Sequence, residues 1–168
     1  MELRPSLPEH PVPASARGAS ATPELRVEGL VDRPLTLGPA DLGGLPRVDV
    51  AEPFTCEEGW QTPALSWHGV RLRDVLDLAA PRVDARWVRV SSGDYAVPIP
   101  LEQAATAMLA DEFNGEPLAT EHGGPWRLVL PGASCFTSVK WVDRLELTGE
   151  PGDASGERIA RARLKTNA

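Results

Sequence analysis

Short alternating runs of apolar and polar residues, separated by prolines and glycines, restrict the fold of this 168-residue chain more than any other feature. Residues 47–51 alternate in this way, which is typical of a half-buried β-strand. A hairpin is predicted where residues 87–91 and 95–99 flank a turn centred on Gly93. With 17 prolines and 15 glycines, turns follow closely on one another, so the strands must be short. Further strands are predicted at 25–31, 108–113, 116–118, 126–130 and 145–147.

Helices are expected to be few and short. Leu72, Val75 and Leu76 have the i, i+3, i+4 spacing of one helix face, and they predict a helix over 72–79 that Pro81 ends. Proline near the first turn favours shorter helical segments at 38–42 and 100–104. Many short strands with a few short helices predict an α+β fold that is rich in β-structure.

The chain is expected to form one domain, spanning residues 23–150. Residues 1–22 are rich in proline, alanine and serine and have no apolar period, which favours an extended N-terminal arm. Residues 151–168 are small, polar and mildly basic, so a flexible C-terminal tail is expected there.

Charge and cysteine content argue against several classes of protein. Seventeen basic and 24 acidic residues give a net charge of −7, and no basic run stands out, so no nucleic-acid partner is expected. No apolar run approaches the length of a membrane span, and the N-terminus has neither a signal-peptide core nor a twin-arginine pair. A cytoplasmic protein without a membrane span is therefore expected. The only cysteines, Cys56 and Cys135, form neither a CxxC zinc site nor a disulfide framework, and the sequence leaves open one bridge between them.

Cys56 stands where reactive side chains are commonly held. It ends an apolar alternating stretch and opens a polar loop that contains Gly59. A loop carried on a rigid strand can hold a metal ligand or a nucleophile in a cleft. A buried structural thiol is the alternative.

Two later stretches combine groups that bind anions. Residues 122–127 join His122 and Arg127 through two glycines and a proline. Residues 131–141 form a glycine- and hydroxyl-rich turn that leads to Lys140. Backbone N–H groups, hydroxyls and cations gathered in one place can cradle a phosphate. Together with Cys56, these stretches suggest a phosphorylated cofactor beside a thiolate.

Each of these residues also has a purely structural interpretation. His122 can bond a carbonyl of its own turn, and Arg127 and Lys140 can be solvated strand residues. Trp126 and Trp141 are expected in the core.

In order and spacing, the chain resembles the molybdopterin-binding domain of the sulfite oxidase family. The resemblance covers about residues 25–149. It is carried by residues 25–31, the strand into Cys56, 67–70 with the helix that follows, 95–101, 114–118, 122–132 and 138–141. It implies the β-rich α+β fold of that family, with mixed sheets and short helices, and a molybdenum–molybdopterin cofactor.

The resemblance also implies roles for individual residues. Cys56 corresponds to the thiolate that binds molybdenum, a soft ligand that adds to the two sulfurs of the pterin dithiolene. His122 and Arg127 correspond to residues that contact the pterin and its phosphate. Ser138, Val139 and Lys140 correspond to the stretch that holds the phosphate end, partly through backbone groups. In such proteins the metal cycles between Mo(VI) and Mo(IV) while an oxo group moves to or from the substrate.

The sequence departs from this pattern at three points. Sulfite-oxidising members carry arginines just after the metal cysteine, whereas this chain carries Glu57 and Glu58, which would oppose a sulfite dianion. The pterin-contacting N-terminal stretch is echoed only by residues 9–13, in which His10 would contact the pterin and fold the arm over the site. No haem domain or dimerisation domain accompanies the domain, so a separate electron-transfer protein, carrying haem or flavin, is expected.

The leading hypothesis is therefore a small molybdopterin-dependent oxidoreductase that transfers an oxygen atom, or performs a related two-electron reaction, on a small molecule other than sulfite. The alternative is a non-catalytic binding or assembly module that keeps the same fold. A cysteine hydrolase is a third hypothesis, and it requires His68 or His122 as a base beside Cys56.

Overall fold

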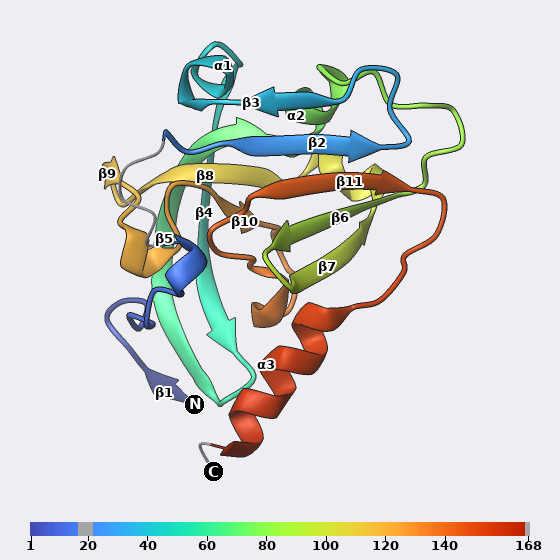
Figure 1. The fold of residues 1–168 in the computed structure, drawn as a ribbon. Helices are drawn as coiled ribbons and strands as arrows, with labels where there is room; N and C mark the ends of the chain where they lie inside the picture. The colour runs from blue at the N-terminus through green and yellow to red at the C-terminus, as the bar shows by residue number, and fades with distance from the viewer. Residues whose placement is uncertain (17–21, 167–168) are drawn as a thin grey trace.

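Two mixed β-sheets form the body of the protein (Figure 1), as a computed structural model shows for residues 1–16 and 22–166. The first sheet has the strand order β3-β2-β11-β6-β7. Strands β2 and β11 are parallel, and the other neighbours in this sheet are antiparallel. Its strands are β2 (Leu25–Gly29), β3 (Leu35–Leu37), β6 (Trp87–Ser92), β7 (Tyr95–Pro100) and β11 (Arg144–Thr148).

The second sheet is built on one long hairpin. Strands β4 (Arg47–Cys56) and β5 (Trp60–Arg71) pair along their length and meet at a turn that contains Gly59 at φ +90°. The other edge of β5 pairs with β8 (Met108–Phe113) near one end and, in parallel, with β1 (Glu2–Leu3) near the turn. Strand β8 also pairs with β9 (Glu116–Pro117) and with β10 (Arg127–Val129).

Short helices connect the strands. The α-helices are α1 (Pro39–Gly43), α2 (Leu72–Asp77) and α3 (Ser155–Thr166). The 3-10 turns are η1 (Ala14–Ala16), η2 (Leu101–Ala105), η3 (Thr120–His122) and η4 (Cys135–Thr137). None of the helices in the described part of the chain has the length and apolar character needed to cross a membrane.

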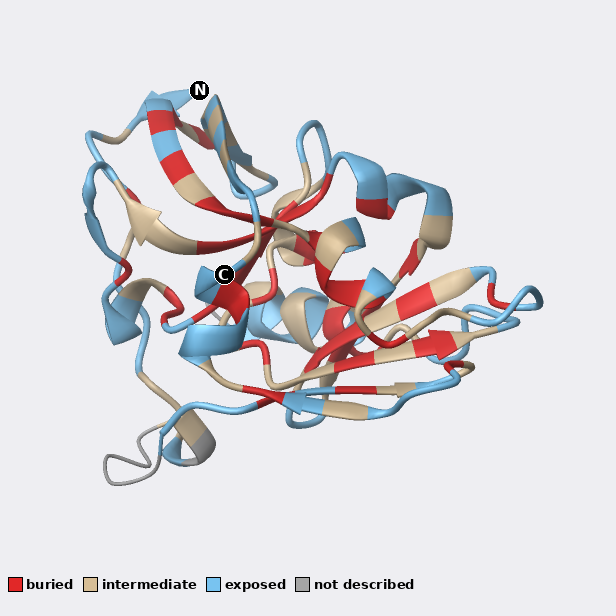
Figure 2. Cartoon of the chain, turned by 90° about the horizontal axis from the view of Figure 1, so that it is seen from above, coloured by how far each residue is buried: buried red, intermediate tan, exposed pale blue. Residues whose placement is uncertain are grey.

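Buried side chains form two clusters (Figure 2). The larger cluster lies between the first sheet and α2, and it includes Leu25, Leu72 and Leu145. The smaller cluster lies on the long hairpin, where Trp60 and Trp67 pack beside Val129 and the half-buried Cys56. The smaller cluster therefore supports the end of the hairpin at which Cys56 stands.

The predicted α+β, β-rich fold with mixed sheets and short helices is confirmed. The strands from 25, 87, 95, 108, 116, 126 and 145 and the helix from Leu72 occur where the alternation predicted them, with ends shifted by a few residues. Strand β4 extends beyond the predicted 47–51 to Cys56, and β5 was not predicted as a strand. Pro53 is accommodated because the pairing register shifts between Pro53 and Thr55. The segment predicted as a helix at 100–104 is the 3-10 turn η2.

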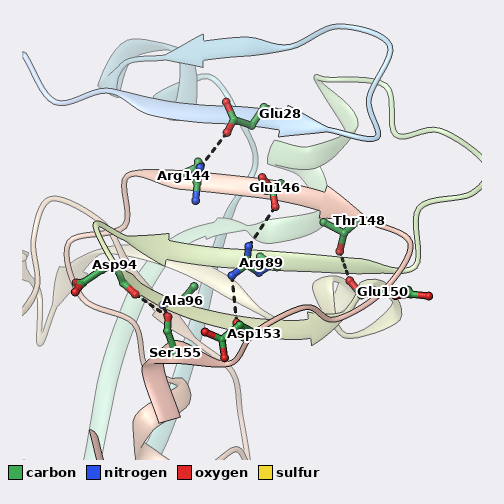
Figure 3. A network of polar contacts seen from close by, with 10 residues as sticks. All are labelled: Glu28, Arg89, Asp94, Ala96, Arg144, Glu146, Thr148, Glu150, Asp153 and Ser155. Atoms are coloured by element: carbon green, nitrogen blue, oxygen red, sulfur yellow. Dashed lines mark hydrogen bonds and ion pairs between the residues drawn. The ribbon is translucent and has the colours of Figure 1, made fainter. Parts of the chain in front are cut away.

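The predicted flexible tail at 151–168 is wrong for most of its length, because Ser155–Thr166 form α3. Figure 3 shows how the start of this helix is tied to the first sheet. The Ser155 hydroxyl accepts a 2.9 Å hydrogen bond from the Ala96 N–H and donates a 2.6 Å bond to the Asp94 carbonyl. Arg89 donates a 3.1 Å bond to the Asp153 carbonyl. Gly156 lies so close to β7 that a Cβ there would be 2.7 Å from the Tyr95 ring.

The start of the predicted N-terminal arm is docked on the long hairpin. The Glu2 N–H donates a 2.9 Å hydrogen bond to the Gly59 carbonyl, and Leu7 is buried in the smaller cluster. The parts of the predicted arm and tail at residues 17–21 and 167–168 lie outside the described residues.

Candidate functional site

The two cysteines lie side by side, although 79 positions separate them in the sequence. Cys56 is the last residue of β4, and Cys135 is the first residue of η4. Their Sγ atoms are 3.6 Å apart, and both are free, half-buried thiols. Burial raises the pKa of Cys56 to about 12, and the neighbouring Cys135 contributes to that increase. Cys56 is therefore a protonated thiol at neutral pH, and it must lose its proton to bind a metal.

Two contacts fix the loops that carry these sulfurs. The Tyr95 hydroxyl donates a 2.7 Å hydrogen bond to the Phe136 carbonyl, directly after Cys135. Arg161 of α3 lies 3.7 Å from the Glu57 carboxylate and places its guanidinium 5.5 Å from the centre of the Phe136 ring. Arg161 therefore contacts the next residue after each cysteine, and it connects α3 to both loops.

Arg127 is a buried cation without an acidic partner. Only 2% of its surface is exposed, and no carboxylate in residues 1–16 and 22–166 forms an ion pair with it. Its guanidinium donates to Ser138 Oγ at 2.8 Å and to the His122 carbonyl at 2.9 Å. Burial lowers the pKa of Arg127 to about 10, so it stays charged. A buried charge of this kind is destabilising unless an anion balances it.

The same guanidinium is stacked on aromatic rings of the long hairpin. It lies 5.0 Å from the centre of the Trp67 ring and 5.7 Å from that of Phe54, two residues before Cys56. The predicted solvated alternative for Arg127 does not hold, and the structure brings Arg127 close to the cysteine end of β4.

His122 ends η3, and its ring nitrogen Nδ1 is buried without a hydrogen-bond partner in the described residues. The ring packs against Phe113, with ring centres 5.5 Å apart. Gly123 follows at φ +106°, where a Cβ would lie 2.8 Å from Lys140 Cβ. Glycine at this position lets the backbone next to His122 approach Lys140 closely. The unpaired nitrogen leaves a donor or acceptor for a ligand.

Lys140 is half-buried beside this loop. Burial, together with the positive charges of Arg127 and Arg163, lowers the pKa of Lys140 to about 7. The next residue, Trp141, has φ +53° and donates from its backbone to the Gly123 carbonyl at 2.9 Å. Trp141 is half-buried, with its indole N–H bonded to the Thr120 carbonyl, so the expectation that it lies in the core is not met. Trp126 is buried in the core as predicted.

Ser138 and Val139 differ in what they offer a ligand. The Ser138 hydroxyl accepts from Arg127, donates to the Leu128 carbonyl at 3.3 Å and lines a cavity. Val139 has its side chain in the larger core cluster, its N–H bonded to the Thr137 carbonyl, and its carbonyl bonded to the Leu128 N–H. Val139 therefore has no open backbone donor for a phosphate, and its described contacts are internal.

His10 lies near the same cations. It is exposed at the surface, but partial burial of its ring lowers its pKa, as do the charges of Lys140, Arg127 and Arg163. The docked arm thus brings His10 close enough to Arg127 and Lys140 for their charges to affect its pKa. These residues were expected to contact the same cofactor as His10.

A cavity of about 180 Å³ opens between the end of β4 and the loop before η4. Its lining includes Phe54, Thr55, Trp67, Ser134, Thr137 and Ser138. The cavity therefore connects the strand that ends in Cys56 with the turn that precedes Lys140.

Glu57 and Glu58, which follow Cys56, contact different groups. Glu58 accepts a 3.0 Å hydrogen bond from the Trp60 indole and lies 3.8 Å from the Cys56 sulfur, whereas Glu57 faces Arg161. Glu58 thus lies beside the thiol, at the exposed surface of the turn.

No histidine contacts Cys56 among the described residues. His68 lies far along β5 from the turn, and its ring bonds Asp49 at 2.6 Å and Arg47 at 3.1 Å. The cysteine-hydrolase hypothesis therefore lacks the base that it requires.

Sequence reasoning did not identify several residues of the site. Phe54 and Trp67 were not singled out, although the rings of both lie near the Arg127 guanidinium. Tyr95 and Arg161 gave no signal, because their contacts with residue 136 depend on how distant elements pack.

A β-rich domain with a half-buried thiol at the end of a strand, and with a buried arginine that no carboxylate of the described residues pairs, is suited to hold an anionic cofactor. More specifically, the chain belongs to the oxidoreductase molybdopterin-binding domain family, whose profile matches residues 10–155. The resemblance to sulfite oxidase predicted from the sequence is confirmed, and the cofactor of this family is molybdenum–molybdopterin.

Named relatives include enzymes of different specificity. The chain is 34% identical over 137 residues to the uncharacterized oxidoreductase YuiH of Bacillus subtilis, covering 80% of this chain and 69% of YuiH. It is 32% identical to the sulfite oxidase of Arabidopsis thaliana, covering 73% of this chain and 41% of that protein. It is 29% identical to a Fusarium oxysporum NADPH nitrate reductase, with 77% of this chain and 18% of that protein covered.

A solved structure shares the fold. The sulfane dehydrogenase SoxCD of Paracoccus pantotrophus superposes with a TM-score of 0.72 at 27% identity, covering 77% of this chain and 39% of that one. The chain therefore spans less than half of the sulfite oxidase, nitrate reductase and SoxCD chains, and about two thirds of YuiH.

The residues present fit this cofactor. Among the described residues, Arg127 has no carboxylate partner and His122 Nδ1 has no hydrogen-bond partner, and Lys140 is half-buried beside them. No three His, Cys, Asp or Glu side chains converge on a metal site anywhere in the part of the chain that the structure describes. One protein sulfur, supplemented by the dithiolene sulfurs of the cofactor, is consistent with that finding.

Proposed function

We propose that this chain is a molybdopterin-dependent oxidoreductase that performs two-electron, oxygen-atom-transfer chemistry on a small molecule, with Cys56 as the protein ligand of molybdenum. The observation that carries the proposal is Arg127, a fully buried cation with no carboxylate partner in the described residues. Such a charge is accounted for by an anionic group bound within the fold.

Cys56 supplies the metal end of the proposed site. Its half-buried sulfur stands at the end of a rigid strand, beside a cavity lined by Phe54 and Thr55. Thiolate is a soft ligand suited to molybdenum, and metal binding would release the thiol proton. When bound, the cofactor supplies the two-electron redox chemistry.

The cations supply the phosphate end. Arg127, held by the Ser138 hydroxyl, and Lys140, held against Gly123, present positive charge with hydrogen-bond donors. His122 offers its unpaired Nδ1 to the pterin, and His10 closes the arm over the same region. Val139 supports the turn through packing.

A substrate other than sulfite is favoured by the charges around Cys56. Glu58 lies 3.8 Å from its sulfur, and Glu57 and Glu157 both face Arg161. Glu57 and Glu157 thus share one arginine, and Glu58 lies beside the thiol. The excess of negative charge repels a dianionic substrate such as sulfite. Neutral S-oxides and N-oxides meet no such repulsion.

A separate electron-transfer protein, carrying haem or flavin, is proposed as the redox partner, and a cytoplasmic location is proposed from the sequence. The matched region makes up 41% of the Arabidopsis sulfite oxidase and 18% of the Fusarium nitrate reductase.

Molybdenum and pterin content test the proposal. Wild-type protein from a host that makes molybdopterin is expected to contain stoichiometric molybdenum and to show thiolate-to-metal absorbance. Cys56→Ser should lose that absorbance and turnover of S-oxides and N-oxides, whereas Arg127→Met should lose the pterin as well. Wild-type protein without metal or pterin from such a host would favour a non-catalytic binding module and would overturn the proposal.

A further inference from the structure

The fold brings two free sulfurs from distant parts of the sequence into contact. Cys56 and Cys135 sit on different elements, with Sγ atoms 3.6 Å apart and no disulfide between them. A disulfide requires a separation of about 2.05 Å, so closure needs a combined movement of about 1.6 Å. Cys56 ends a strand and Cys135 begins a 3-10 turn, so each can adjust without breaking the interior of an element.

The surroundings keep the two thiols together. Arg161 contacts both Glu57 and Phe136, and Tyr95 holds the Phe136 carbonyl. Two reactive groups held at this distance by a folded scaffold react as if at very high concentration. Both are half-buried and not sealed in the core, so small oxidants can reach them.

We propose that Cys56 and Cys135 form a redox-active dithiol that closes into a reversible intramolecular disulfide whenever no cofactor occupies the Cys56 sulfur. The proposal that the two sulfurs bond rests on their geometry alone. Its consequence rests on the proposed function: a sulfur tied to Cys135 is unavailable to molybdenum, and reduction makes it available again.

The chemistry is balanced with a peroxide as the oxidant. One thiol sulfur attacks a peroxide oxygen, the O–O bond breaks, and a sulfenic acid and one water form. The second sulfur attacks the sulfenic sulfur, and the hydroxyl leaves as a second water with the remaining thiol proton. Two electrons pass from the sulfurs to the peroxide. A small dithiol reverses the step by exchange and is itself oxidised to a disulfide.

The disulfide would protect the metal-binding sulfur. A lone sulfenic acid continues to sulfinic and sulfonic acids, which ordinary thiols do not reduce. Capture by Cys135 stops this sequence at a state that a dithiol can restore. The pair therefore preserves Cys56 in protein that awaits its cofactor.

The first test uses the full-length, cofactor-free protein, titrated with hydrogen peroxide and then alkylated. Wild type is expected to lose two hydrogen atoms in intact mass, to accept no alkylation, and to yield one linked peptide pair containing Cys56 and Cys135. Dithiothreitol should restore both thiols. Separate sulfenic or sulfinic acids on the two cysteines, or only intermolecular dimers, would overturn the inference.

Cys135→Ser is the matched control, because it retains Cys56 and removes only its partner sulfur. After peroxide, Cys56 in this variant should react with dimedone and then oxidise irreversibly. Molybdenum content after reconstitution with molybdopterin and molybdate gives the second measurement. Oxidised wild type should take up at least about tenfold less metal than reduced wild type, with full recovery after dithiothreitol. Oxidised Cys135→Ser should show no recovery.

Cofactor-loaded protein provides the third measurement. Its Cys56 is engaged, so peroxide should leave the loaded wild type without the Cys56–Cys135 link. A link that never forms in cofactor-free protein, while Cys56→Ser still loses molybdenum, defeats this inference and leaves the proposed function intact. A link that forms without reducing metal uptake defeats the role of Cys56 as metal ligand, and with it the control of cofactor loading.

Discussion

Arg127 Nε donates a 2.8 Å hydrogen bond to Ser138 Oγ, and this contact joins the stretch that carries Arg127 to the stretch that leads to Lys140. Arg127 belongs to β10, whereas Ser138 follows η4, so the bond fixes the turn before Lys140 against the sheet. No carboxylate of the described residues neutralises the charge of Arg127. This charge should therefore destabilise the cofactor-free protein and favour the binding of an anionic cofactor.

Arg127→Met separates these two effects. Replacing the unpaired buried guanidinium with an apolar side chain should stabilise the cofactor-free protein by about 1 kcal/mol, because the desolvated charge disappears. Molybdopterin content after expression in a competent host should fall by at least about tenfold, the value of one charge-assisted contact. Urea unfolding and pterin analysis measure the two quantities.

Arg89→Met is the control for this prediction. Arg89 pairs with Glu146 at 3.4 Å and with the Asp153 carbonyl at 3.1 Å, so its removal leaves a partly buried carboxylate unpaired. This variant should lose stability and retain its pterin. A loss of stability in Arg127→Met as large as that in Arg89→Met would contradict the view of Arg127 as an unbalanced charge.

Lys140 should make the stability of the cofactor-free protein depend on pH. Burial holds its folded-state pKa at about 7, below the ordinary lysine value, so above pH 7 the unfolded chain binds more protons than the folded one. Stability should therefore rise with pH from about 7 toward 9, by at most about 1.4 kcal/mol per pH unit. Lys140→Met should be more stable than wild type at neutral pH and should lack this rise.

Denaturant titrations of both proteins at several pH values measure the difference directly. Comparing the variant with wild type cancels the contributions of other groups that titrate in the same range. Parallel stability curves for the two proteins would show that Lys140 is fully charged in the empty fold. Loss of the lysine should also reduce pterin retention, because its charge increases when a phosphate binds.

Gly123→Ala tests the close approach beside His122. The alanine Cβ would lie 2.8 Å from Lys140 Cβ at a backbone φ of +106°, so both a steric overlap and backbone strain result. We expect a loss of about 2–3 kcal/mol in stability together with reduced cofactor content. Thermal unfolding and molybdenum analysis provide the measurements.

Gly115→Ala isolates the strain. Gly115 has φ +84°, but nothing lies within 4 Å of a Cβ placed there. It should cost only about 1 kcal/mol and leave metal content unchanged. Equal effects at the two glycines would show that contact with Lys140 is unimportant.

Ser155→Ala should loosen α3. The hydroxyl serves both the Ala96 N–H and the Asp94 carbonyl, so alanine leaves a buried donor and acceptor without their partner. We expect about 1–3 kcal/mol of destabilisation and faster amide exchange along the helix. Thr166→Ala, which removes an exposed bond to the Ala162 carbonyl, should change neither.

Much of this architecture can be predicted from local patterns. The alternation around Val48 and Val90 is a period-two signal that survives packing, so the strands and their hairpins occur where expected. The anion-binding stretches are also local, because glycine, hydroxyl and cation types are adjacent in the sequence around Lys140. The order of these motifs makes the family recognisable.

What could not be predicted depends on contacts between distant elements. Helix α3 has few apolar residues, and its start is fixed by Ser155 and by the close fit of Gly156 on Tyr95, which no periodicity reveals. The engagement of the Val139 backbone follows from pairing with Leu128 across the turn. The approach of Cys135 to Cys56 likewise follows from tertiary packing, since the sequence gives only their separation.

Both ends of the described chain contact the same three-residue turn. Glu2 bonds Gly59 through β1, and Arg161 of α3 reaches Glu57, so β1 and α3 both border the loop that follows Cys56, in the lower part of Figure 1. A segment fused ahead of β1 would consequently start out near Cys56. An affinity tag placed there would compete with visiting molecules for access, whereas an electron carrier placed there would begin next to the thiol.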